Sequence, residues 1–269
     1  MIHHLRKHLK LYIRYIYLDF KIYRQYWSYL VTTFIQYLTY TIISVVFWQA
    51  VFFNVTAIGD WDVSKLVMLS GMMFVGFGLY IHFWGFYNLP GKIRQGDLDL
   101  YLSKPINPVA AIIFSEINAG AAISEMTTGL TVVASAAIYY RIPIILANLA
   151  TGLGLLVLGD LVLVLMQGTI SCSAFWLGKT GIIQGMRDLL DDFERFPITL
   201  LPSGLRFLLT YIIPMALVST YPTLIIVGDI EALQTLWIAI IELALLLLWA
   251  VAFSKAWHAG IQRYSSLGG

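Results

Sequence analysis

Six long apolar stretches constrain this chain more than any other feature of its sequence. A helix needs about 20 apolar residues to cross about 30 Å of hydrocarbon. The stretches that meet this length are Leu30–Phe53, Val63–Phe86, Val109–Ile138, Ile144–Leu177, Leu205–Val227 and Leu233–Phe253. Only 12% of the 269 residues are charged, about half of the ~25% typical of soluble domains. The sequence therefore predicts an all-α polytopic membrane protein with six transmembrane helices.

Lys and Arg are distributed unevenly between the two sides that these spans define. Six precede the first span, three lie between the second and third, four between the fourth and fifth, and two follow the sixth. Only Lys65 and Arg141 lie on the other side. Because cytoplasmic segments carry the excess of Lys and Arg, we expect a multi-pass cell-membrane protein with both termini in the cytoplasm. The predicted parts are segment 1–28, a six-span domain 29–257 with cytoplasmic loops 89–108 and 178–204, and a tail 258–269.

The N-terminal segment has the pattern of an amphipathic helix. Its apolar and aromatic residues recur every three or four positions, while the basic residues fall largely off this stripe: Leu5, Leu9, Tyr12, Ile16, Phe20, Tyr23 and Trp27. Such a helix is typical of the membrane surface, and we expect it on the cytoplasmic leaflet. The alternative is a solvated helix packed on a soluble partner.

No motif for catalysis or metal binding stands out. Gly178, Lys179 and Thr180 resemble the end of a phosphate-binding loop, but Ser173 occupies the first glycine position and the segment follows an apolar span. His82 is expected to be a hydrogen-bonded packing residue, and no His clusters with Cys or carboxylates. We therefore expect no catalytic residue, no cofactor or metal, and no nucleic-acid partner. If ATP drives this protein, a partner must bind and hydrolyse it.

Four acidic residues lie within the predicted spans, where a charge is costly and often functional: Glu116, Glu125, Asp160 and Glu242. If they line a translocation path, carboxylates in an apolar cavity favour a cationic or amine-bearing amphiphile. The alternative is a structural role, in which they are protonated or hydrogen-bond across helix interfaces. Pro214 and Pro222 interrupt the fifth stretch, so this span is expected to be broken or re-entrant, and both are candidates for an outer gate.

The loop between the second and third spans is expected to carry a short helix. It begins at Pro90-Gly91 and ends at Pro105-Ile-Asn-Pro108, with charged residues and four large apolar ones between them. This composition suits a helix that runs along the membrane surface and docks in a groove on a cytoplasmic partner. The alternative is a plain connector.

Three motifs, in order along the chain, resemble a known family. They are IRQGDLDLYLSKPINP at 93–108, FERFPITLLPSGLRFLLTYIIPMALVSTYP at 193–222 and GIQRYSSLGG at 260–269. They are similar to segments of small ABC-type-2 exporter permeases. The resemblance implies a six-helix membrane subunit that pairs with a second permease, identical or homologous, and with two ATPase subunits that bind ATP and Mg. It also implies that loop 89–108 is the coupling helix, with the docking role falling on Arg94, Gly96, Asp97, Leu98, Asp99 and Tyr101.

The expected function is thus a non-catalytic permease subunit that exports a hydrophobic or amphiphilic compound, cationic if the four acids line the path. A proton-coupled secondary transporter using Glu116, Glu125 or Asp160 is the alternative from another class. A structural membrane protein is the third, although it would need neither buried acids nor a structured loop.

Overall fold

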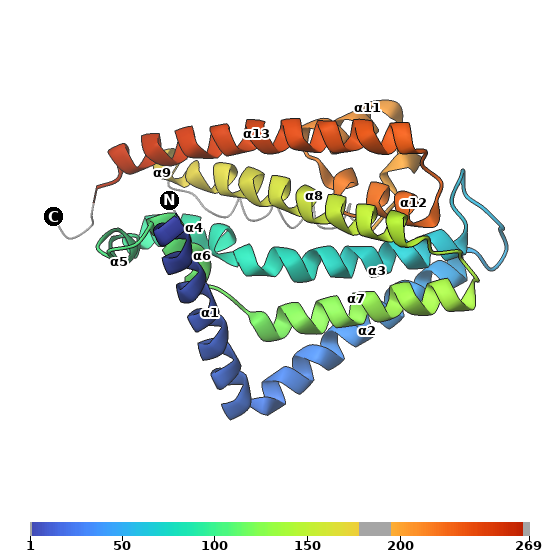
Figure 1. Cartoon of the computed structure of the whole chain (residues 1–269), viewed down its shortest axis with the longest axis horizontal. Helices are drawn as coiled ribbons and strands as arrows, with labels where there is room; N and C mark the ends of the chain where they lie inside the picture. Colours follow the sequence, from blue (N-terminus) through green and yellow to red (C-terminus); the bar gives the residue numbers. More distant parts are fainter. Residues whose placement is uncertain (1, 178–194, 266–269) are drawn as a thin grey trace.

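The computed structural model describes residues 2–177 and 195–265, and all described regular elements are helices (Figure 1). The first half contains α1 (Ile2–Gln25), α2 (Trp27–Val51), α3 (Val63–Tyr80), η1 (Ile81–Phe83), α4 (Trp84–Gln95), α5 (Asp99–Leu102), α6 (Pro108–Ser115) and α7 (Ala119–Tyr139). The second half contains α8 (Leu146–Cys172), α9 (Ala174–Leu177), η2 (Ile198–Leu200), α11 (Ser203–Phe207), η3 (Leu208–Ile212), η4 (Met215–Leu217), α12 (Thr220–Val227) and α13 (Ala232–Arg263).

Five described helices are long and apolar enough to cross a membrane, which confirms the all-α membrane fold. They are α2, the continuous run Val63–Gln95, α7, the run Leu146–Leu177 and α13. Two of the predicted boundaries change. The second span continues through Pro90 to Gln95, and the third is divided, because α6 ends at Ser115 and α7 begins at Ala119.

The bundle has two distinct ends. One end carries α5, α9, the N-terminus and the end of α13, whereas the other carries the connections 52–62, 140–145 and 228–231 (Figure 1). Arg94 and Lys104, on either side of α5, lie at the first end. The cytoplasmic position of both termini stays a prediction.

Residues 195–204 correct the predicted loop 178–204, of which 178–194 lie outside the described residues. Trp61 Nε1 donates a hydrogen bond to Thr199 Oγ1 over 2.7 Å, and Phe196 packs edge-on against Trp48. In contrast, Phe175 of α9 packs against Tyr264 at the end of the termini. Leu177 and Phe196 therefore lie at opposite ends of the bundle, and the prediction of one cytoplasmic loop is wrong.

The predicted fifth span is re-entrant, one of the two alternatives that its prolines indicate, because both of its ends lie at the same end of the bundle. It begins at Ser203, beside Thr199, and ends before Asp229, which forms an ion pair with Lys65 at the start of α3. Its two halves, Ser203–Ile212 and Met215–Val227, meet at an angle of 75°. The segment is thus re-entrant. The start of α1 and the end of α13 lie at the same end of the bundle (Figure 1).

Glycine residues allow α3 and α7 to approach closely at the centre of the bundle. A Cβ atom at Gly71 would lie 2.8 Å from Val133, and one at Gly78 would lie 2.9 Å from the Ala122 carbonyl. Small residues at helix contacts are the usual means of packing helices within a membrane. Helix α3 is accordingly the most buried span, whereas α2 and α13 lie at the periphery.

Candidate functional site

The expected coupling region is a compact segment, residues 94–107, which we call the α5 segment. Helix α4 ends at Gly96, whose φ of 81° is in the left-handed region that favours glycine. Two residues later Leu98 is wholly buried, in a cluster with Phe86, Ile112 and Trp257. The turn of helix α5 follows directly. The segment is therefore fixed to the bundle from behind and is not a loose connector.

The side chains of the α5 segment divide into an inner and an outer set. Arg94, Asp97, Leu100 and Lys104 are exposed, and Leu100 is 63% exposed despite being apolar. Leu98 anchors the segment, so it cannot be a docking residue as the resemblance implied. Gly96, Asp99 and Tyr101 are only partly exposed. The outer face thus presents two cations, one acid and an aliphatic side chain.

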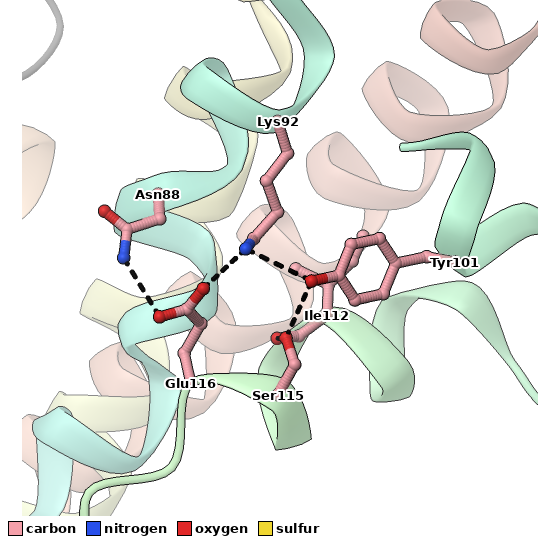
Figure 2. Close-up of polar contacts among 6 residues, drawn as sticks. All are labelled: Asn88, Lys92, Tyr101, Ile112, Ser115 and Glu116. Atoms are coloured by element: carbon pink, nitrogen blue, oxygen red, sulfur yellow. Dashed lines mark hydrogen bonds and ion pairs between the residues drawn. The ribbon is translucent and has the colours of Figure 1, made fainter. Parts of the chain in front are cut away.

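An ion pair and its hydrogen bonds hold the inner side of the α5 segment (Figure 2). Lys92 Nζ of α4 lies 2.5 Å from Glu116 Oε1, and the two side chains are 13% and 27% exposed. Lys92 Nζ also donates to the Tyr101 hydroxyl over 3.2 Å, and Ser115 Oγ donates to the same oxygen over 3.2 Å. Asn88 Nδ2 donates to the other oxygen of Glu116. The network joins α4, α5 and the break between α6 and α7.

The C-terminal motif also contacts the α5 segment. The Tyr264 hydroxyl donates a hydrogen bond to the Gly96 carbonyl over 3.2 Å. Burial, followed by the nearby carboxylates of Asp99 and Asp97, raises the pKa of the Tyr264 phenol. Two of the three motifs of the sequence therefore meet in space, at the end of the bundle that carries the termini.

Helix α1 docks on the break between α6 and α7. Asp19 accepts a hydrogen bond from the Ala119 backbone N–H over 2.7 Å, and the Tyr23 hydroxyl donates to Asn118 Oδ1. Burial, followed by the negative charge of Asp19, raises the pKa of Tyr23 to about 12. The Asp19 contact satisfies one N–H group that the start of α7 leaves without a helical partner. The expected membrane-surface position of α1 stays a prediction, and its exposed Leu9 and Phe20 are consistent with it.

The two prolines of the re-entrant segment differ in position. Pro214 stands at the bend, between η3 and η4, where no regular helix continues. Pro222 lies in the first turn of α12 and is buried. Proline is tolerated there because the first N–H groups of a helix have no intrahelical partner. Only Pro214 is therefore at the break, and a gating role for either residue stays a prediction.

The four acidic residues do not share one site. Glu116 is paired with Lys92, although no basic partner was expected in the spans. Glu125 of α7 lines a cavity of about 570 Å³ between α2 and α3. Asp160 of α8 lines a second cavity of about 580 Å³, together with Tyr12 and His82. Glu242 of α13 is wholly buried. Neither cavity contains more than one of the four.

Comparison with known families decides the class of this protein. The family model described as ABC-2 family transporter protein matches residues 38–268. The chain belongs to this family. At the thresholds applied, no curated protein and no solved structure matches. The protein is therefore an ABC-2 type transporter permease, as the three motifs indicated.

The match includes the α5 segment, the re-entrant segment and all four acidic residues, but it begins within α2. Helix α1, which docks on the α6–α7 break of the permease, precedes the matched region. Asp19 and Tyr23, which make these contacts, therefore lie outside the matched region.

Sequence reasoning missed several residues that organise the α5 segment of the permease. Lys92 lies in the predicted loop 89–108 and Asn88 just before it, and the sequence alone indicates a role for neither. Their spacing of four places both on one face of α4, which is the signal that could have revealed them. Leu98 and Leu100 are both among the large apolar residues of the loop, and the sequence alone does not show which is buried. In the structure the chain reverses at Gly96, Leu98 is buried and Leu100 faces outward.

Proposed function

We propose that this ABC-2 permease is the membrane subunit of an ATP-driven exporter, energised by a separate ATPase that docks on the α5 segment. The observation that carries the proposal is the difference between the buried inner side and the exposed outer side of this segment. Leu98 and the Tyr101–Lys92–Glu116 network tie its inner side to two helices, while Arg94, Asp97, Leu100 and Lys104 remain exposed. A surface that is fixed to two helices can transmit a movement of its partner to the spans.

The assembly that we propose contains two permease subunits and two ATPase subunits in the cell membrane, with the termini in the cytoplasm. The ATPases would bind ATP and Mg, and the permease itself would carry out no catalysis. The exposed apolar faces of α2 and α13 are available for lipid or for the second permease. We leave open whether the second subunit is identical or homologous.

We propose export rather than import because the described connections at the far end are short. Residues 52–62, 140–145 and 228–231 do not form a receptor domain for external solute. The substrate would be hydrophobic or amphiphilic and would pass between the two permease subunits. The re-entrant segment, bent at Pro214, would form the outer gate.

The proposal is tested by reconstituting the permease with its co-expressed ATPase in liposomes. We expect Leu100→Arg to abolish ATP-dependent transport and co-purification of the ATPase, because a charge replaces the central apolar side chain of the outer face. Gln262→Arg is the matched control, since Gln262 is exposed near the end of α13 and gains the same charge. It should leave both properties unchanged.

A proton-coupled transporter would give the opposite pattern. Transport would then persist without an ATPase, stop on addition of a protonophore and be insensitive to Leu100→Arg. This result would overturn the proposal.

A further inference from the structure

The cavity between α2 and α3 has an unusual lining. Nine of its fifteen lining residues are aromatic, and they include Tyr37, Trp48, Phe77 and Trp84. Glu125 is the acidic residue among them, and the Tyr37 hydroxyl hydrogen-bonds to its carboxyl group. The volume of about 570 Å³ is in the range that holds small organic ligands, roughly 300–1,000 Å³.

Among the described residues of the lining, Glu125 and Arg195 are the charged ones, and they lie near different parts of α2. Tyr37 contacts Glu125, whereas Trp48 packs against Phe196, the neighbour of Arg195. Both aromatic residues belong to α2, and a helix rises about 16 Å over the eleven residues that separate them. Glu125 and the backbone next to Arg195 therefore lie against parts of α2 that are about three helical turns apart.

The chemistry of this lining favours a positively charged ligand. Aromatic faces attract cations, most strongly where water is excluded, and Glu125 is only 7% exposed. A carboxylate within a membrane span is costly unless it is paired. An anion would meet both the carboxylate and the negative faces of the rings, and a neutral apolar compound would offer the carboxylate no charge beyond its hydrogen bond with Tyr37.

We infer that this cavity binds a lipophilic organic cation, with Glu125 as the counter-ion and the surrounding rings as a cation–π cage. The inference rests on the proposed function in one respect, because it names the substrate class of the exporter. Tyr40 and Phe47 on the α2 wall are 53% and 47% exposed, so we expect the cavity to be reached from the membrane side. The ligand would enter sideways between α2 and α3.

Binding is tested on the purified full-length permease in nanodiscs without ATPase, so that the result does not depend on energy coupling. The probe is radiolabelled tetraphenylphosphonium, and its shape-matched control of opposite charge is tetraphenylborate. We expect saturable binding of the cation, weakened at least about tenfold by Glu125→Gln and severalfold by Trp84→Leu. Tetraphenylborate should not compete.

Glu242→Gln is the matched control, because Glu242 is an equally buried acid outside this cavity. It should bind the cation with an affinity within about twofold of the wild type. Tyr40→Leu changes a half-exposed ring of the wall, so it tests the cage even if Glu125→Gln does not fold.

The inference is overturned if the wild type shows no saturable binding, if tetraphenylborate competes equally, or if Glu125→Gln and Tyr40→Leu bind like the wild type. Failure of the proposed function would look different. The cation would then bind as described, but ATP and the ATPase would not drive its transport.

Discussion

Lys92 and Glu116 form an ion pair that bridges the end of the second span and the break between α6 and α7. The Tyr101 hydroxyl accepts a hydrogen bond from the same ammonium group, so the pair also holds the α5 segment. Any displacement of this segment is therefore transmitted to two helices at once. In the proposed function, the partly buried pair would link a docked ATPase to the spans.

The pair should behave as a coupled unit in unfolding experiments. Hydrogen bonds to charged groups contribute about 1.5–3 kcal/mol, so we expect Lys92→Met and Glu116→Gln each to lower the free energy of unfolding by about 1–3 kcal/mol. The double variant should cost less than the sum, by about 1 kcal/mol. Lys255→Met, which alters an exposed lysine of α13, serves as the control. Strictly additive losses would contradict the bridge.

Leu98 and Leu100 should respond in opposite ways to the same truncation. Leu98→Ala removes a wholly buried side chain and should lower the free energy of unfolding by about 2–5 kcal/mol. Leu100→Ala alters a side chain that is 63% exposed and should change it by less than about 0.5 kcal/mol, while weakening ATPase binding. Unfolding curves and co-purification measure the two effects. A docking defect confined to Leu98→Ala would reverse our assignment of the inner and outer faces.

Asp62 should stabilise the start of α3 in a pH-dependent way. Its carboxylate accepts hydrogen bonds from the Lys65 N–H over 3.0 Å and from the Ser64 hydroxyl. Burial acts to raise the pKa of Asp62, but these hydrogen bonds and the Lys65 charge outweigh it, so the net pKa is below the ordinary value. Asp62→Ala should cost about 1 kcal/mol at neutral pH.

A lowered pKa gives stability that is present above the unfolded-state pKa of about 3.9 and is lost as the pH falls through the lower folded-state value. The difference in unfolding free energy between the wild type and Asp62→Ala should therefore shrink in acid. Asp62→Asn keeps an acceptor oxygen, and its unfolding free energy should vary less with pH. A difference that grows on acidification would contradict the role of this cap.

The corrected topology predicts where introduced cysteines can be labelled. Ser203 at the start of α11 and Ser103 in the α5 segment are both exposed, at opposite ends of the bundle. In intact cells, a membrane-impermeant maleimide should label Ser203→Cys but not Ser103→Cys, which should react only after permeabilisation. The native Cys172 is buried and gives little background. If Ser203→Cys is labelled only from the cytoplasm, this residue belongs to the predicted cytoplasmic loop 178–204, and the corrected topology is wrong.

The spans were predictable because twenty apolar residues have few alternatives to a transmembrane helix. Hydropathy alone does not distinguish a crossing helix from one that turns back, and Pro214 and Pro222 indicated a break in Leu205–Val227 without showing which of the two it is. Hydropathy also assigned Arg195 and Arg206 to the cytoplasm, because a loop after the fourth span was taken to remain on that side. The contacts of Trp61 with Thr199 and of Trp48 with Phe196 place residues 196–199 at the end of the bundle away from α5.

The sequence predicted where the candidate site lies, but not which of its residues contact one another. The motif around Gly96 and Asp97 marked the α5 segment, and Tyr264 belonged to a second motif. That these motifs touch is a long-range contact that no local pattern encodes. The four acidic residues looked equivalent in sequence, whereas their surroundings differ: an ion pair for Glu116, an aromatic cavity for Glu125 and the bundle interior for Glu242.

Cross-linking from the α5 segment tests the central claim most directly. Leu100→Cys and the buried Leu98→Cys are treated with a short bifunctional maleimide in membranes that contain the co-expressed ATPase, and the adducts are identified by mass spectrometry. The account predicts a permease–ATPase adduct from Leu100→Cys and none from Leu98→Cys or the wild type. Absence of the ATPase from every Leu100→Cys adduct, in membranes where ATP-dependent transport is measured, would contradict it.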